Sequence, residues 1–270
     1  MMKLSISQVC TLNHSFAADI EEYASAGFQH VEIWLTKLED FLAKKSLDDA
    51  KELLRAHNMT PVAASFQGGL LTSQGEARAE AWKLFERRLV LCRDLQVGVI
   101  VVACDPSPPL KDVDIQRLQM SLRELADRAQ EHRVRVALEF QSNAALGNNL
   151  QTAAALVDEV SHPHLGICLD SFHFYVGPSK TEDLRYLNAS NLAHVQLSDL
   201  ADKPRELALD GDRIIPGDGD LPLPTIVGHL QHIGYEGSVS VELMNPQIWQ
   251  IPALQMADVG FQALQRLVNS

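Results

Sequence analysis

Four side chains that carry oxygen atoms stand at or near the ends of apolar stretches. Glu139 follows VRVAL, Asp170 follows LGICL, Glu242 follows GSVSV, and Gln196 is the next-to-last residue of LAHVQL. An unpaired buried carboxylate is costly, and three carboxylates held close together raise each other's pKa values. A divalent cation relieves that repulsion, and a set of oxygen ligands suits Mn²⁺ or Mg²⁺. The pattern predicts one cation site if the four stretches end at a common edge.

Each of these residues also has a structural interpretation. Asp170 is a good cap for a following turn. Glu139 and Glu242 could form buried salt bridges with a lysine or arginine, and Gln196 could simply end a strand. His173, three residues after Asp170, could bind the cation, support a ligand or contact a substrate. We favour the last two roles for His173.

Strand and helix patterns alternate along the chain, and the strands must position these side chains. The predicted strands are Lys3–Val9, His30–Leu35, Thr60–Phe66, Gly98–Cys104, Val134–Phe140, the start of Leu165–Tyr175, Leu192–Leu197 and Gly237–Leu243. Helical patterns lie between them and after the last strand, among them one that Ser46 caps. No flexible linker interrupts the eight units, and GxGxxG is absent after the first strand. We therefore predict an α/β protein with a single-domain (β/α)8 TIM barrel spanning residues 1–270.

A TIM barrel keeps its active site at the carboxyl ends of its strands. Glu32, Trp34, Gln67 and Asp105 stand at further strand ends and are expected to line the pocket, where Trp34 could stack on a sugar. The long loop Ser198–Pro224 contains DRIIPGDGD, in which Arg213 could anchor substrate hydroxyls or a phosphate. The alternative is an exposed arginine. Since few other basic residues fall near this rim, we lean toward a substrate without phosphate.

Composition limits the partners. The net charge of −12 argues against nucleic acid as the main partner. No apolar run approaches the roughly 18 residues of a membrane span, and the start of the chain lacks the pattern of a signal peptide. The four cysteines form no CxxC pair, which is typical of free thiols in a reducing compartment. We expect a cytoplasmic protein.

Several of these stretches resemble a known family. The motifs ALEF, LDSFHF, HVQLSD, DRIIPGDG and VSVEL are similar to those of the xylose-isomerase-like TIM barrels, a superfamily of sugar phosphate isomerases and epimerases. The similarity is greatest to the inosose-isomerase-like branch, related to tagatose/psicose 3-epimerases and hydroxypyruvate isomerases. HVEIW, SLDDAKELL and the first strand also fit, so the resemblance spans nearly the whole chain.

The resemblance implies one divalent cation, Mn²⁺ or Mg²⁺ with Zn²⁺ and Co²⁺ as alternatives, in an enzyme that acts on a small sugar or polyol and assembles as a dimer or tetramer. The implied ligands are Glu139, Asp170, Gln196 and Glu242, and His173 and Arg213 would contact the substrate. One position departs from the pattern. The epimerase and inosose branches usually carry His where this chain has Gln196. The hydroxypyruvate isomerases resemble this chain in having Gln there. An amide oxygen favours Mg²⁺ or Mn²⁺ over Zn²⁺.

The predicted reaction is proton transfer next to a carbonyl, through a metal-stabilised cis-enediolate of a keto sugar, inosose or related polyol. Glu139 and Glu242 would serve as base and acid from opposite sides. Use of both faces of the enediolate gives epimerisation, and transfer between neighbouring carbons gives isomerisation. Both outcomes stay open.

Three other functions share this barrel. A dehydroshikimate-type dehydratase uses the same cation and base but then expels a hydroxyl group. An apurinic-type endonuclease needs several extra histidines, whereas the third and fourth strands end in Ser65, Phe66, Gln67, Cys104 and Asp105. A barrel that only binds a ligand would lack a functional cation. We therefore prefer the isomerase or epimerase.

Overall fold

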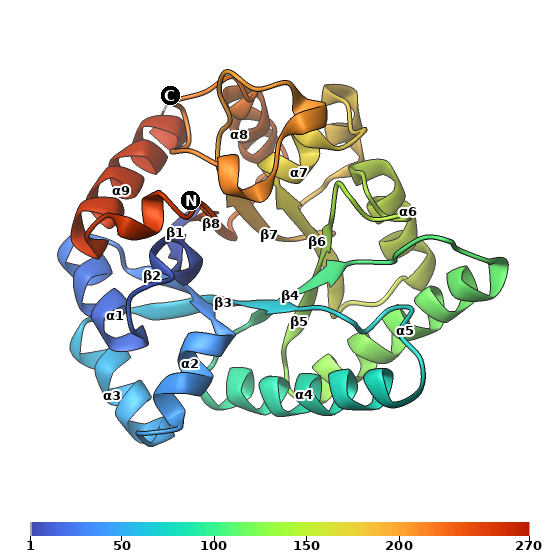
Figure 1. The fold of residues 1–270 in the computed structure, drawn as a ribbon, viewed down its shortest axis with the longest axis horizontal. Coiled ribbons are helices and arrows are strands. Elements are labelled where there is room, and N and C mark those ends of the chain that lie inside the picture. Colours follow the sequence, from blue (N-terminus) through green and yellow to red (C-terminus); the bar gives the residue numbers. More distant parts are fainter. Residues whose placement is uncertain (1, 270) are drawn as a thin grey trace. The chain divides into compact units, whose positions relative to one another are not determined.

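Eight strands in the order β1 to β8 form a closed barrel in the computed structural model, which describes residues 2–269 (Figure 1). The strands are β1 Lys3–Ser7, β2 His30–Trp34, β3 Thr60–Gln67, β4 Val99–Cys104, β5 Arg135–Phe140, β6 Leu165–Asp170, β7 Leu192–Leu197 and β8 Ser238–Val241. Neighbouring strands such as β4 and β5 pair in parallel. The predicted (β/α)8 TIM barrel is confirmed.

Helices alternate with the strands. The α-helices are α1 Phe16–Ser25, α2 Leu35–Leu42, α3 Leu47–Ala56, α4 Gly75–Asp94, α5 Asp112–Glu131, α6 Leu150–Val160, α7 Ser171–Val176, α8 Leu223–His232 and α9 Ala253–Asn269. Short 3₁₀ turns are η1 Gln8–Thr11, η2 Thr181–Tyr186, η3 Arg205–Leu207, η4 Asp210–Asp212 and η5 Ile248–Gln250. Ser46 caps α3, as predicted, in a reciprocal capping box with Asp49. Because β8 ends at Val241, Glu242 lies just beyond it and not inside a strand.

The contacts within the chain define two compact units. The terminal unit contains the residues up to Ala64 and those from Val195 onward, and the central unit is Ser65–His194. The prediction that residues 1–270 form one domain stays a prediction. In the central unit, β4, β5 and β6 pair side by side around a small core of Val101, Ala137, Cys168 and Ala193.

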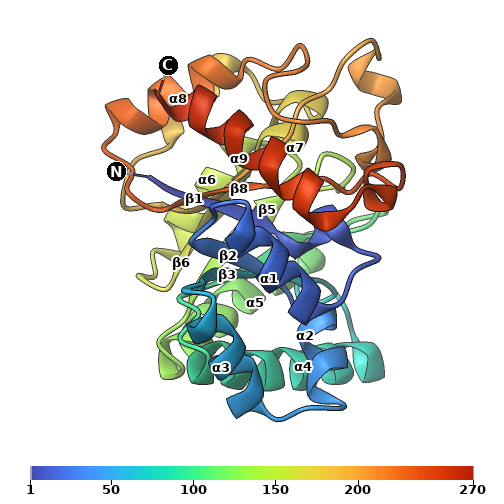
Figure 2. The ribbon, with the colours of Figure 1, turned by 90° about the vertical axis from the view of Figure 1, so that its left-hand side faces the viewer.

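In the terminal unit, β1 pairs with both β2 and β8, and α9 packs against α1 and β1 (Figure 2). Phe261 of α9 meets Phe28 edge to face, with ring centres 5.0 Å apart. Gly27 has a φ of +100°, and a Cβ there would come within 3.1 Å of the Phe261 ring. Glycine suits the position after α1 because the backbone angle disfavours a side chain and the Phe261 ring leaves little space for one.

A buried ion pair joins α1 to α2 in the same unit. Lys37 Nζ lies 2.6 Å from Asp19 Oδ2 and also donates to the Thr11 carbonyl oxygen, although Lys37 is 7% exposed and Asp19 is 0% exposed. Burial raises the pKa of Asp19 to about 6 and lowers the pKa of Lys37. Gln8 donates to Asp19 (3.2 Å) and accepts from the backbone N–H of Trp34 (3.2 Å). The pair is thereby connected to the carboxyl end of β2.

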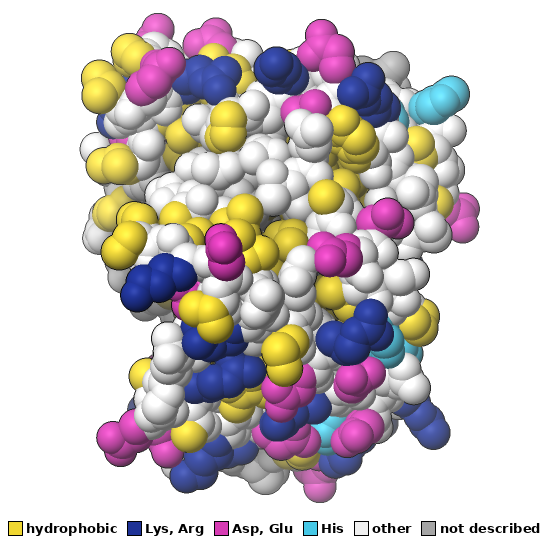
Figure 3. All heavy atoms as spheres, turned by 90° about the vertical axis from the view of Figure 1, so that its right-hand side faces the viewer, with side chains coloured by type: hydrophobic (Ala, Val, Ile, Leu, Met, Phe, Trp, Pro, Cys, Tyr) yellow, Lys and Arg dark blue, Asp and Glu magenta, His cyan; other side chains and the backbone are white. Residues whose placement is uncertain are grey.

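Surface charges are mixed. On the face drawn in Figure 3, basic and acidic side chains are interspersed. Arg117 of α5 pairs with Asp114 on the same helix at 2.5 Å, and Arg128 pairs with Glu124 at 2.6 Å. These arginine charges are compensated locally. Among residues 2–269, none of the helices is both long and apolar enough to cross a bilayer.

Replacing Lys37 should strongly destabilise the fold, because Lys37→Met leaves the buried Asp19 carboxylate without its cation. We expect a loss of about 3–5 kcal/mol in the free energy of unfolding at pH 7, measured by urea denaturation. The loss should shrink as the pH falls, since a protonated Asp19 needs no counter-charge. Asp19→Asn in the Lys37→Met background should recover part of it, whereas Lys51→Met, on the exposed side of α3, should change little. An equal loss in the single and double variants would refute a charge-based role.

Candidate metal centre and active site

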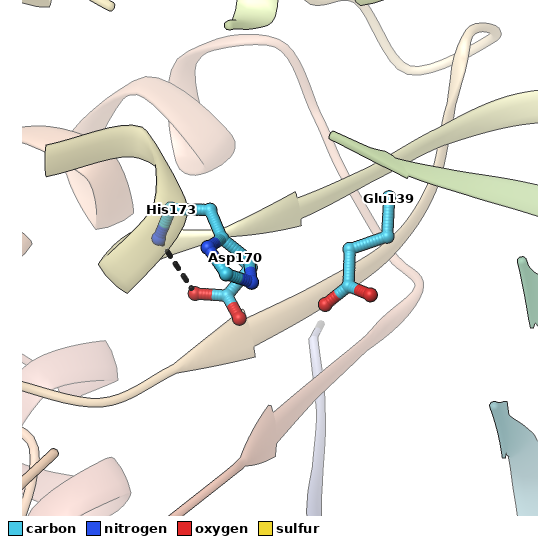
Figure 4. Close-up of side chains that lie close together, drawn as sticks. All are labelled: Glu139, Asp170 and His173. Carbon is cyan, nitrogen blue, oxygen red and sulfur yellow. Dashed lines mark hydrogen bonds between the residues drawn. The ribbon is translucent and has the colours of Figure 1, made fainter. Parts of the chain in front are cut away.

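Three predicted side chains converge in the central unit. Glu139 of β5, Asp170 of β6 and His173 of α7 each offer a ligand atom, and these atoms lie within 4.8 Å of one another (Figure 4). All three residues are buried. Two carboxylates and an imidazole at this separation form a set that can hold a divalent cation. The sequence predicted the two acids as ligands, and the geometry brings His173 beside them.

Asp170 has the capping role that the sequence offered as one of two alternatives, and its role as a cation ligand stays a prediction. Its Oδ1 accepts hydrogen bonds from the backbone N–H groups of Phe172 (2.6 Å) and His173 (3.2 Å), so it caps the first turn of α7 (Figure 4). Both donors belong to the backbone, so they hold this oxygen in a defined place. The cap therefore orients the candidate ligand.

The loop after β5 supports the other two side chains. Gln141 Nε2 donates to Glu139 Oε2 at 2.6 Å. The backbone N–H of Ser142 points to His173 Nδ1 at 3.4 Å, and the Ser142 hydroxyl lies 3.2 Å from the same nitrogen. Because a backbone N–H can only donate, Nδ1 acts as the acceptor, which assigns the proton of the neutral ring to Nε2. A protonated Nε2 suits hydrogen bonding to a substrate oxygen better than ligation.

A second cluster lies in the terminal unit. Gln196 Nε2 donates to Glu32 Oε1 and to Glu242 Oε1, both at 2.8 Å, and the three residues are buried. Glu32 comes from β2, Gln196 from β7, and Glu242 follows β8. The sequence predicted Gln196 and Glu242 as ligands but Glu32 only as a residue lining the pocket. The sequence signal that could have identified Glu32 is its position as an acid inside the apolar strand HVEIW.

Arg213 is buried, with an exposed fraction of 1%, which excludes the interpretation of an exposed arginine. Its guanidinium donates to Asp210 Oδ1 at 2.9 and 3.2 Å, and Nη1 lies 3.4 Å from both Glu242 Oε2 and Ser198 Oγ. A buried arginine is stable only when it is paired in this way. Its contacts fix the Glu242 carboxylate, and its predicted contact with substrate stays a prediction.

The long loop that carries Arg213 folds around a buried carboxylate. Asp199 accepts backbone hydrogen bonds from Leu200, Gly217 and Leu221, each at 2.9 Å. A Cβ at Gly219 would overlap the Leu200 carbonyl oxygen and the Asp199 carboxylate. The sequence predicted a functional loop but gave no role to Asp199, because its donors lie up to 22 residues away.

The other predicted pocket residues form hydrogen bonds within the chain. Gln67 Oε1 accepts from Arg88 Nη1 at 3.1 Å, and Asp105 Oδ2 accepts from the Gly69 N–H at 2.7 Å, so both are tied to the segment after β3. Trp34 ends β2, is half-buried, and its backbone binds Gln8. Their predicted role in substrate binding stays a prediction.

Comparison with known proteins agrees with this architecture. The model of the family described as xylose isomerase-like TIM barrel matches residues 20–267. A protein named inosose isomerase from Bacillus velezensis is 28% identical and covers 99% of this chain and 98% of that protein. A crystal structure described as the IolI protein with a binding zinc atom has a TM-score of 0.91 and 27% identity, over 99% of this chain and 98% of that one.

A 3-dehydroshikimate dehydratase from Pseudomonas aeruginosa is 27% identical, over 97% of this chain but 41% of that protein. These relatives carry the names of enzymes, and the resemblance predicted from the motifs is confirmed. The bound zinc in one relative and the converging Glu139, Asp170 and His173 both support a divalent metal.

Removing the charge of Asp199 should loosen the loop around it. Asp199→Asn turns one acceptor oxygen into an NH₂ group that faces a backbone N–H, so at least one charge-assisted hydrogen bond is lost. We expect a loss of about 1.5–3 kcal/mol in the free energy of unfolding and faster proteolysis within residues 200–221. Asp218→Asn, an exposed acid of the same loop, is the matched control. Equal protease resistance of Asp199→Asn and Asp218→Asn would argue against this role.

Proposed function

Since the chain belongs to the family of xylose isomerase-like TIM barrels, we propose that it is a divalent-metal-dependent isomerase or epimerase of an inosose or a related keto sugar or polyol. The convergence of Glu139, Asp170 and His173 on one buried point is the observation that carries the reaction class. The substrate class is supported by relatives named inosose isomerase, which align with nearly the whole chain.

The proposed cation ligands are Glu139, Asp170, Gln196 and Glu242. Their support is that β5, β6, β7 and β8 are consecutive in the barrel and that each has one of these residues at or just past its carboxyl end. Three carboxylates and one amide oxygen form a hard donor set, which favours Mn²⁺ or Mg²⁺, with Zn²⁺ and Co²⁺ as alternatives. When bound, the cation supplies positive charge beside the carbonyl and hydroxyl oxygens of the substrate.

The remaining chemistry belongs to side chains of the chain. Glu139 and Glu242 would remove a proton from the carbon next to the carbonyl and return it. Gln141 holds Glu139 through a 2.6 Å hydrogen bond, and Arg213 holds Glu242, so both carboxylates are oriented before substrate arrives. His173 would donate from Nε2 to a substrate oxygen.

Trp34, Gln67 and Asp105 are the proposed walls of the substrate pocket, together with Arg213. We also propose that the protein works in the cytoplasm on a small molecule and assembles as a dimer or tetramer, as the resemblance implies.

A dehydratase is the second candidate, because a 3-dehydroshikimate dehydratase is 27% identical over 97% of this chain. Its reaction begins with the same proton removal and then expels a hydroxyl group. New ultraviolet absorbance from a conjugated product would identify this activity, whereas an isomerase or epimerase conserves the composition of its substrate.

Single Glu139→Gln and Glu242→Gln variants should lose proton transfer, because an amide cannot accept a proton in this pH range. We expect exchange of the substrate carbon-bound hydrogen with D₂O, followed by NMR with a panel of inososes and ketoses, to fall by about 10²–10⁴-fold. Glu131→Gln, at the exposed end of α5, is the control and should exchange normally. Near wild-type exchange in both variants would refute the mechanism.

Removing divalent metal with a chelator should abolish exchange, and Mn²⁺ or Mg²⁺ should restore it better than Zn²⁺. Mn²⁺ at 100 times its dissociation constant should also raise the free energy of unfolding by about 2.7 kcal/mol, which thermal unfolding measures without substrate. Gln196→His should raise the affinity for Zn²⁺ relative to Mn²⁺, because imidazole is the softer ligand. Full activity and unchanged stability in metal-free protein would refute the proposed cation, because the barrel would then work without one.

A further inference from the structure

Glu32 is a buried acid of the terminal unit, and the proposed chemistry assigns no role to it. It is 0% exposed, and its Oε1 accepts a 2.8 Å hydrogen bond from Gln196 Nε2. We propose that Glu32 is a positioning residue that fixes the orientation of the Gln196 amide and so presents the amide oxygen to the cation. This inference rests on the proposed function, in which Gln196 is a cation ligand.

The amide of Gln196 lies between two carboxylates, and this leaves it one stable orientation. Its NH₂ group has two hydrogens, and Nε2 lies 2.8 Å from Glu32 Oε1 and 2.8 Å from Glu242 Oε1. Rotating the amide by 180° would place its oxygen against both carboxylate oxygens. Such repulsion is large where water is excluded, as it is around these buried side chains. Oε1 of Gln196 is therefore directed away from Glu32 and Glu242.

The orientation matters because the two ends of an amide differ as ligands. The nitrogen lone pair is delocalised and protons occupy the nitrogen, so only the oxygen can bind a hard cation. Without Glu32, the amide nitrogen would lose one of the two carboxylates that receive its hydrogen bonds. Glu32 of β2 supplies a second bond and also places a negative charge beside the amide. Partners of this kind commonly change metal affinity by about 10–100-fold.

Glu32 is itself held in place by the backbone and by the buried ion pair. In the β1–β2 ladder it lies opposite Ser7, and two residues later the Trp34 N–H donates to Gln8. Gln8 is in turn anchored to Asp19, the partner of Lys37. This chain of contacts fixes the end of β2. A positioning carboxylate must be held rigidly, because its effect depends on a well-defined distance to the amide.

Glu32→Gln is the direct test, since it keeps the shape of the side chain but allows residue 32 to donate as well as accept. The flipped orientation of the Gln196 amide is then opposed by Glu242 alone, so the amide is held less firmly. We expect the dissociation constant for Mn²⁺, measured by calorimetry on metal-free protein, to rise about 10–100-fold while the melting temperature of the metal-free protein stays close to that of wild type. Glu21→Gln, an exposed acid of α1, is the matched control and should bind Mn²⁺ normally.

A conservative variant gives the second test of the positioning role. If Glu32→Gln folds poorly, Glu32→Asp keeps the charge with a shorter reach and should give an intermediate affinity.

The outcomes separate this inference from the proposed function. Wild-type Mn²⁺ affinity in folded Glu32→Gln overturns the positioning role and leaves the cation site intact. An equal loss of affinity in Glu32→Asp and Glu32→Gln also overturns it, because the loss is then independent of the charge that orients the amide. Wild-type protein that binds none of Mn²⁺, Mg²⁺ or Zn²⁺ overturns the cation site itself, and the positioning role with it.

Discussion

Buried carboxylates are the constraint on which the structure depends. Glu139, Asp170, Asp199 and Glu242 are all removed from water, where an unpaired charge is costly. Each of them receives hydrogen bonds from donors fixed by the fold: backbone N–H groups for the aspartates, side-chain amides for the glutamates, and additionally a guanidinium for Glu242. The donors stabilise the charges and also orient them, so the same contacts serve the stability of the fold and the geometry of the site.

Most strands and several helix starts were predictable because their causes are local. The run LGICLD predicted β6, and Ser46 followed by two acids predicted the start of α3. Helix α2 was not predicted, since it begins directly after Trp34 without a side-chain cap. What stabilises it is not local: Lys37 binds Asp19 of a different helix. An ion pair of that kind leaves no pattern in the sequence around α2.

The candidate site was predictable in its residue types and not in its contacts. Acids at the ends of apolar runs indicated Glu139 and Asp170, because burial of a charge is rare without a reason. The sequence around Gln196 could not show how strong a candidate ligand it is, since the acid that orients it, Glu32, lies 164 residues away. Asp170 appeared to require a choice between cap and ligand, whereas a carboxylate has two oxygens and can do both.

These arrangements also indicate where substrate choice resides. The relatives include proteins named isomerase and proteins named dehydratase, so membership of the family does not by itself select between inosose rearrangement and loss of water. Loops tolerate substitution more readily than strands, because their backbones are at the surface. In this chain the loop around Asp199 carries Arg213, whose guanidinium reaches Glu242. A change in that loop would therefore also change the contacts of Glu242, the carboxylate that we propose to be catalytic, and would couple the proposed choice of substrate to the orientation of that acid.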